Sequence, residues 1–152
     1  MVTLRKQIIE NLKTRLSEYT WSVLDAPAVY SGRTRFDPDE EPLPVVTIIA
    51  GMEDGIEQTA FRTNFRIMPL EVTALVGIED AKEAFDIGED IFGELERACF
   101  SGGYLAVNEE DYFLGLRGGG IVDYPDQLGA AILTITVSLE ITYETEIGVP
   151  EI

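Results

Sequence analysis

The longest regular pattern in the chain is an alternation of apolar and polar residues near its C-terminal end. The odd positions from 133 to 143 are apolar and the even positions between them are polar: Leu133, Ile135, Val137, Leu139, Ile141 and Tyr143 against Thr134, Thr136, Ser138, Glu140 and Thr142. A period of two predicts a β-strand with one face in a core and the other in solvent or on a partner. This strand is longer than the usual five or six residues. A long strand with a hydroxyl-lined outer face is typical of proteins that build surfaces.

Two segments carry apolar residues at helical spacing. Residues 4–18 predict an amphipathic helix, with Thr3 suited to cap its N-terminus. A second helix is predicted to begin at Asp80, because Asp80 and Glu83 form an acidic capping box. Ser101-Gly102-Gly103 ends this helix. The buried stripe of the second helix is predicted to consist of Ala84, Gly88, Ile91, Phe92, Leu95 and Cys99.

Shorter apolar runs predict the remaining strands. These lie at residues 21–30 (broken at Pro27), 45–50, 58–62, 68–76 and 120–124. Pro69 falls inside one run, which predicts an edge strand or a bulge there. The charged, proline-rich segment 31–44 predicts a long exposed loop, residues 104–119 are expected to be loop-like, and residues 125–129 to form a turn.

The order of these elements predicts an α+β fold, a two-layer sandwich in which a mainly antiparallel sheet carries two helices packed on one face. The strands are expected to pair mainly as meanders. At 152 residues without a repeat or a boundary, residues 1–152 are predicted to form a single domain large enough to bury a core. The long strands are expected to expose edges that a neighbouring subunit covers.

Charge is unevenly distributed along the chain. The net charge is −17: residues 1–66 hold eight basic against ten acidic residues, whereas residues 67–152 hold only Lys82, Arg97 and Arg117 against eighteen acids. Such a chain should repel nucleic acid and anionic membranes. The acidity favours simple solubility, or alternatively a surface that DNA passes without binding.

The N-terminus and the apolar runs bear on localisation. The N-terminal segment is amphipathic and contains Glu10, so it lacks the continuous apolar region of a secretory signal. No apolar run approaches the roughly 20 residues that span a bilayer. The sequence therefore predicts a protein made and used in a cytoplasm.

The sequence lacks the residues that most common catalytic mechanisms require. There is no histidine, which excludes His-ligated zinc, His general bases and Ser-His-Asp or Cys-His mechanisms. The single cysteine, Cys99, excludes an intrachain disulfide and is expected to be a buried core thiol rather than a nucleophile. The lysines are expected to be exposed, which disfavours a Ser-Lys pair. We expect no enzyme activity and no cofactor.

Two further patterns favour ordinary explanations over binding sites. Arg117-Gly118-Gly119-Gly120 precedes a β run and no lysine follows, so a flexible turn is favoured over a phosphate cradle. Asp86 and Asp90 lie one helical turn apart in an acidic run, but a Mg²⁺ or Ca²⁺ site usually needs further oxygen ligands from a loop. A solvated helix face is the favoured interpretation.

Arg33 and Arg35 stand in a loop otherwise rich in acids and prolines. Arginines in a projecting loop can form forked hydrogen bonds with carboxylates of a neighbouring acidic subunit. The alternative is solvated, solubilising charge. Both interpretations stay open, although arginine is enriched at protein interfaces.

Three segments, in order, resemble the tail-terminator proteins of long-tailed bacteriophages, the minor tail protein U type. The first is Tyr30-Ser31-Gly32-Arg33, leading through an acidic loop into Leu43-Pro44-Val45-Val46-Thr47-Ile48. The second is Pro69-Leu70-Glu71-Val72-Thr73-Ala74, followed by the capped helix from Asp80. The third is Leu139-Glu140-Ile141-Thr142-Tyr143-Glu144. The resemblance covers nearly the whole chain, except for residues 115–120 and those beyond Thr145.

The resemblance implies a structural, non-enzymatic phage or prophage tail protein. Such proteins form a ring, typically a hexamer, that caps the tail tube, ends its polymerisation and joins the tail to the head. The implied partners are other copies of the chain, the tail-tube protein and a head-completion or connector protein, with no membrane and no specific nucleic-acid binding, although DNA passes through the lumen. The implied location is the virion tail, and the host cytoplasm during assembly.

On this interpretation Arg33, Arg35 and Phe36 are expected at a contact with an adjacent subunit or the tail tube. The alternatives are another head–tail connector or tail-completion protein, and, from a different class, a small α+β ligand-binding or enzymatic domain. Fold alone does not exclude the last of these.

Overall fold

A computed structural model describes residues 3–33, 42–51, 54–58, 63–78, 84–107, 110–112, 114–117, 121–123 and 131–146. It contains two helices, α1 (Leu4–Glu18) and α2 (Ala84–Phe100). Its strands are β1 (Ala28–Ser31), β2 (Val45–Ala50), β3 (Asp54–Gln58), β4 (Thr63–Ile78), β5 (Leu105–Val107), β6 (Glu110–Tyr112), β7 (Leu114–Leu116), β8 (Ile121–Asp123) and β9 (Ala131–Glu146).

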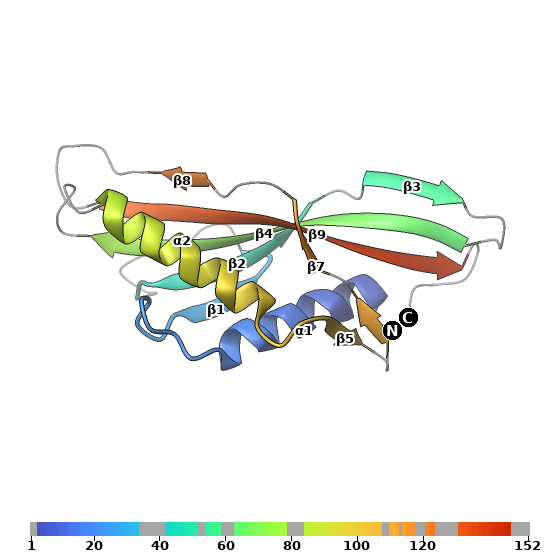
Figure 1. Ribbon diagram of the computed structural model, residues 1–152, viewed down its shortest axis with the longest axis horizontal. Coiled ribbons are helices and arrows are strands. Elements are labelled where there is room, and N and C mark those ends of the chain that lie inside the picture. Colours follow the sequence, from blue (N-terminus) through green and yellow to red (C-terminus); the bar gives the residue numbers. More distant parts are fainter. Residues whose placement is uncertain are drawn as a thin grey trace.

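The structure is an α+β sandwich with both helices on one side of the main sheet, as the sequence predicted (Figure 1). The main sheet has the order β1-β2-β4-β9-β7, with β3 also paired to β4 and β8 also paired to β9. Strands β5 and β6 form a separate hairpin. The expectation of simple meanders is wrong, because β1 and β2 are parallel and the largest pairing joins β4 to the distant β9.

The two long strands, β4 and β9, form the centre of the sheet. They are antiparallel neighbours along their whole length, from Thr63 opposite Glu146 to Ile78 opposite Ala131. On its other side β4 is covered by β2 and β3, and β9 is covered by β7 and β8. The expectation that the long strands expose their edges is therefore wrong for most of β4. Strands β7 and β8 pair with β9 only at residues 139–141 and 134–136, and no described strand pairs with residues 142–146 on that side.

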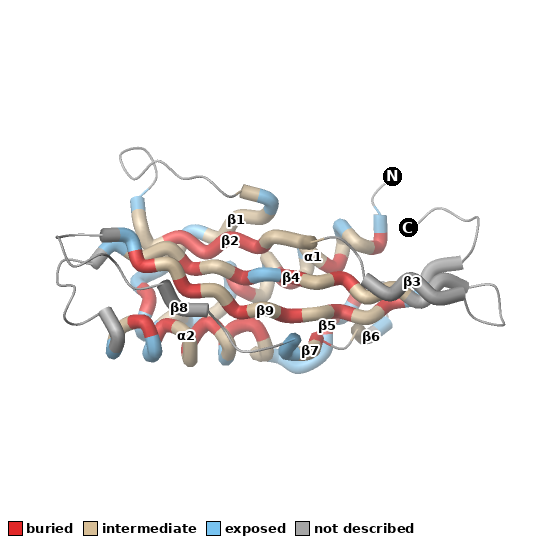
Figure 2. The backbone as a smooth tube through the Cα atoms, turned by 90° about the horizontal axis from the view of Figure 1, so that it is seen from above, coloured by how far each residue is buried: buried red, intermediate tan, exposed pale blue. Residues whose placement is uncertain are grey.

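The alternating pattern of β9 has the predicted consequence. All six apolar side chains at the odd positions 133–143 are at most 2% exposed, and they face the helices together with Met68, Leu70, Val72 and Ala74 of β4. The polar residues between them are partly exposed, so buried and partly exposed positions alternate along both strands (Figure 2). Burial of the apolar face is the main stabilising contribution of this pairing.

Pro69 lies in an interior strand, so the prediction of an edge strand is wrong for β4. Its carbonyl accepts a hydrogen bond from Gly51 N (2.9 Å), just beyond the end of β2. The N–H and C=O of one residue in an antiparallel strand point to the same neighbour. The missing N–H of Pro69 therefore faces the gap between β2 and β3, and no hydrogen bond to β9 is lost.

Helix α1 begins as predicted, because the Thr3 hydroxyl accepts a hydrogen bond from Lys6 N (3.1 Å). Its buried residues are Leu4, Ile8, Leu12 and Leu16. Arg15 connects the two helices, because its guanidinium donates to the carbonyl of Cys99 in the last turn of α2 (2.8 Å) and to that of Tyr104 beyond the helix (2.9 Å). The last carbonyls of a helix lack intrahelical partners, and a cation there also suits the helix dipole.

Helix α2 follows the prediction from Gly88 to its end. Gly88, Ile91, Leu95 and Cys99 are buried, Phe92 is half-buried, and Gly102 and Gly103 end the helix at positive φ. The predicted capping box at Asp80 and Glu83 lies outside the described residues, as does the side chain of Ala84. The start of the helix is therefore described only from Ala84 onward.

Three other segments differ from the prediction or lie outside the described chain. Residues 104–119 were expected to be loop-like but contain β5, β6 and β7. The predicted strand at 21–30 is only β1, since residues 22–24 form bends. Strand β3 ends at Gln58, so the predicted pairing at 59–62 lies outside the description, as does the turn at 125–129. The strand predicted at 120–124 is present as β8.

Candidate functional site

The sheet face opposite the helices carries a row of threonines. Thr47, Thr73 and Thr136 are direct cross-strand partners on β2, β4 and β9. The hydroxyls of Thr73 and Thr136 are 3.0 Å apart, and the Thr47 hydroxyl donates to the carbonyl of Arg33 at 2.6 Å. The segment after β1 therefore covers Thr47, which is 3% exposed. We call this surface the outer face.

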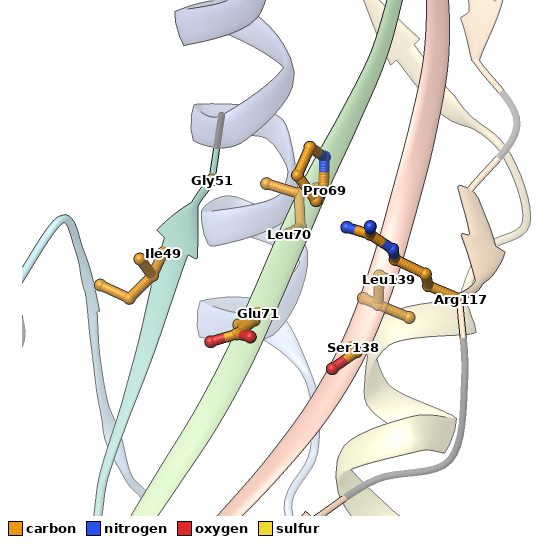
Figure 3. Close-up of a pocket in the computed structure, with 8 residues that line it drawn as sticks. All are labelled: Ile49, Gly51, Pro69, Leu70, Glu71, Arg117, Ser138 and Leu139. Carbon is orange, nitrogen blue, oxygen red and sulfur yellow. The ribbon is translucent and has the colours of Figure 1, made fainter. Parts of the chain in front are cut away.

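A shallow groove of about 570 Å³ crosses the outer face where β2 ends (Figure 3). Figure 3 shows the Arg117 side chain extending from the end of β7 across β9, with Glu71 of β4 and Ser138 of β9 nearby. The backbone N–H of Arg117 donates to the carbonyl of Ser138 (3.0 Å), which fixes the main chain from which this side chain extends. The other lining residues are Ile49, Gly51, Pro69, Leu70 and Leu139. This arrangement suits polar contacts with a protein surface.

The arrangement around Arg117 also bears on the phosphate-cradle alternative. Arg117 follows strand β7 and precedes strand β8, so its segment connects two strands that both pair with β9. A phosphate cradle of the common kind opens a helix instead. Gly118, Gly119 and Gly120 themselves lie outside the described residues.

A second groove, of about 480 Å³, lies between the N-terminal end of α1 and strands β1 and β2. We call it the helix groove. Arg5 and Lys6 stand on its rim with Glu10, and Arg5 also donates to the carbonyl of Gly51 (2.7 Å). Its remaining lining residues are Thr3, Ile9, Ser31, Gly32, Ile48, Ile49 and Ala50. The groove therefore combines apolar side chains with a rim on which cations outnumber carboxylates.

Arg33, a predicted interface residue, packs against its own chain. Its guanidinium carbon lies 4.8 Å from the centre of the Tyr30 ring, within the range of a cation–π interaction. With its carbonyl bonded to Thr47, the half-buried Arg33 is held at both its backbone and its side chain. It follows Gly32 of the helix groove directly. Arg35 and Phe36 lie outside the described residues.

Cys99 has the environment of a core thiol. It is fully buried, and burial raises its pKa to about 12, with a smaller contribution from Glu96 in the same direction and an opposing one from Arg15. At neutral pH it is therefore a thiol, whereas the thiolate is the nucleophile.

The acidic run on α2 has the environment of a solvated helix face. Asp86, Glu89 and Asp90 are all exposed. Across the described ranges, no three His, Cys, Asp or Glu side chains gather in a way that could hold a metal ion.

Glu94 is a buried charged residue that the sequence reasoning did not single out. It is fully buried, and its carboxylate accepts hydrogen bonds from Ser22 N (2.7 Å), Ser22 Oγ (2.6 Å), Val23 N (2.9 Å) and Leu24 N (2.8 Å). Burial raises the pKa of Glu94, but the combined hydrogen bonds outweigh burial and lower it below its usual value. The only sequence signal was its place next to Leu95 on the apolar stripe.

The chain matches no protein-family model, and a search of curated proteins found no significant match. Within the part of the chain that the structure describes, neither helix has the length and apolar character needed to cross a membrane.

Proposed function

We propose that this protein is a structural tail protein of a long-tailed phage or prophage, a tail-terminator that forms a ring on the end of the tail tube. The observation that carries the proposal is the placement of the three resembling segments. They fall on β1 and β2, on β4, and on β9, which are four successive strands of one sheet. The resemblance therefore concerns one contiguous unit of the fold rather than scattered fragments.

Surface chemistry supports the same proposal. The outer face offers hydroxyls, Glu71 and Arg117 in a shallow groove, a combination suited to protein contacts. The excess of acids in residues 67–152 disfavours tight binding of DNA, as a channel that DNA slides through requires. In the proposed ring most of these acids face the lumen or solvent.

The proposal is tested on the polymerisation of the tail tube. The tail-tube protein of the same phage or prophage would be polymerised with and without the purified chain, and tube lengths measured on negatively stained images. We expect shorter tubes with a ring at one end. An unrelated protein of similar negative charge is the control for non-specific effects. Unchanged tube lengths, with no bound ring, would overturn the proposal.

The same assay separates the terminator from the other phage functions considered above. A head–tail connector or tail-completion protein would bind a finished tail or a head without limiting tube length. The enzymatic alternative gains no support from Glu94, the carboxylate with a shifted pKa in the described chain, because backbone and serine donors occupy it. We therefore keep the terminator as the proposed function.

A further inference from the structure

The two helices of the structure carry opposite net charge. Helix α1 holds four cations, Arg5, Lys6, Lys13 and Arg15, against two carboxylates. Helix α2 holds five carboxylates against the single cation Arg97. One helical layer of a strongly acidic protein is therefore divided into a positive and a negative half.

The exposed parts of these charges lie at opposite ends of the helical layer. The first turns of α1, with exposed Lys6, lie at the right of Figure 1, and the first turns of α2 lie at the left. The view from above keeps the same separation along the long axis (Figure 2). Asp86, Glu89 and Asp90 are exposed at the α2 end. The helical layer thus has a basic end, at the start of α1, and an acidic end, at the start of α2.

The basic end is also the end with the helix groove. Arg5 and Lys6 stand in the first turn of α1, where no acidic residue is present. Cations are disfavoured beside the positive end of a helix dipole, whereas an anion placed there is stabilised. The partly exposed Ile9 and Ile49 add apolar surface to the lining of the groove. The groove therefore combines apolar burial with attraction for carboxylates.

We propose that the helix groove of one copy receives the acidic face of α2, formed by Asp86, Glu89 and Asp90, from a second copy. The partner is a second copy because the chain itself carries the complementary acidic helix at its other end. Nucleic acid and anionic membranes would be repelled by the rest of a chain of net charge −17. This inference rests on the proposed function, since it names the surfaces that would join neighbouring subunits of the ring.

The geometry of such a contact favours ring assembly. The two surfaces differ, so the contact is heterologous and leaves one free groove and one free acidic face on every pair of copies. Further copies add in the same way until the rotation closes. A symmetric dimer through this contact would instead place like charges together, at a cost in affinity.

Charge reversal at each end tests the contact. Lys6→Glu alters the groove and Asp90→Lys alters the acidic face, and both residues are exposed. Mass would be measured by light scattering after size exclusion and by sedimentation velocity over a range of concentrations. Lys13→Glu and Glu18→Lys are matched controls, because they make the same charge changes on α1 outside the groove.

We expect each variant at the contact to associate roughly tenfold more weakly, from lost attraction and new repulsion. The controls should associate like the parent protein. An equimolar mixture of the two single variants should recover assembly, because each interface in an alternating ring then joins either the original charges or the exchanged ones. This recovery would not follow from damage to the fold.

Three outcomes would overturn the inference. These are a parent protein that stays monomeric at about 100 μM, reversals that act no more strongly than their controls, and a mixture that does not recover. The test is independent of tube capping, so its failure is distinguishable from failure of the proposed function. A terminator that limits tube length while the reversals leave its assembly intact would retain the function and lose this contact.

Discussion

At the scale of single residues, Glu94 uses a buried charge to fix a loop. A carboxylate removed from water is costly unless hydrogen bonds compensate for the lost solvation. Here three successive N–H groups and one hydroxyl of residues 22–24 provide them. The same connection contains Ala26 at a φ of 40°, in the left-handed region that non-glycine residues rarely adopt. We infer that Glu94 acts by holding the α1–β1 connection against α2.

Replacing Glu94 with glutamine should destabilise the fold. Glutamine keeps the size of the side chain but turns an NH₂ donor toward backbone donors, so at least one buried N–H loses its acceptor. Breaking hydrogen bonds to a buried charge costs about 2–3 kcal/mol. Urea unfolding at neutral pH, followed by circular dichroism, would measure the loss. Glu89→Gln, on the exposed face of the same helix, is the control and should change the free energy of unfolding by less than about 0.5 kcal/mol.

The lowered pKa of Glu94 predicts how this contribution depends on pH. The unfolded chain takes up the proton near the usual value of 4.5, whereas the folded chain does so only at lower pH. The contribution of Glu94 is therefore fully present above about pH 4.5, and it is lost as pH falls through the folded pKa. We expect the stability difference between the parent and Glu94→Gln to shrink as the pH is lowered below about 4.5. A difference that stays constant over this range would contradict the assignment.

At the scale of elements, long periodic segments could be predicted and short ones could not. Strand β9 and helix α1 each repeat their pattern over many residues, so the periodicity specified both the element and its buried face. Strands β5, β6 and β7 have three residues each, too few for a period, and they exist through pairing with distant segments. Pro69 suggested an edge strand because sequence alone does not show that β2 ends opposite it.

The candidate site was less predictable than the fold, for a related reason. The helix groove joins the start of α1 to β1 and β2, and the groove on the outer face joins residues from Ile49 to Leu139. Glu94 meets donors about 70 residues earlier in the chain. Charge content was visible in the sequence, but the division of charge between opposite ends of one helical layer required the three-dimensional arrangement.

Replacing glycine with alanine should have opposite effects on stability at Gly51 and at Gly93. A Cβ on Gly51 would lie 3.0 Å from Cγ of Pro69, part of a rigid ring, whereas a Cβ on Gly93 would meet only the tip of Arg97 at 3.3 Å. Gly51→Ala should therefore destabilise the protein by about 1–2 kcal/mol through overpacking. Gly93→Ala should stabilise α2 by about 0.5–1 kcal/mol, because alanine favours the helix. Thermal unfolding of both variants would show shifts of opposite sign, and a common sign would contradict this account.

At the scale of the whole molecule, assembly must overcome self-repulsion. Copies with a net charge of −17 repel one another unless cations lie at their contacts. The described cations are divided between internal roles and exposed positions. Arg5 and Arg15 bond backbone carbonyls of the same chain, whereas Lys6 is exposed on the rim of the helix groove. Arg33 directly follows Gly32 of this groove in the chain and lies over the ring of Tyr30.

The Arg33→Glu/Arg35→Glu double variant tests whether the loop that holds these two arginines takes part in assembly. Loss of the stacking on Tyr30 should cost at most about 1 kcal/mol of stability, as expected for a cation–π contact that is not deeply buried. Assembly and tube capping should fall much further, because two attractive charges become repulsive toward an acidic neighbour. Chemical unfolding would report the first effect, and light scattering with tube-length measurements the second.

The matched control for the loop is Arg33→Lys/Arg35→Lys, which keeps both charges but lacks the planar guanidinium. If simple charge attraction drives the contact, the lysine variant should assemble nearly as well as the parent. If forked hydrogen bonds to carboxylates matter, it should lie between the parent and the glutamate variant. If assembly and tube lengths stay normal with both arginines changed to glutamate, the loop carries only solvated charge. The contacts of the ring would then lie elsewhere, and the helix groove would be the next surface to test.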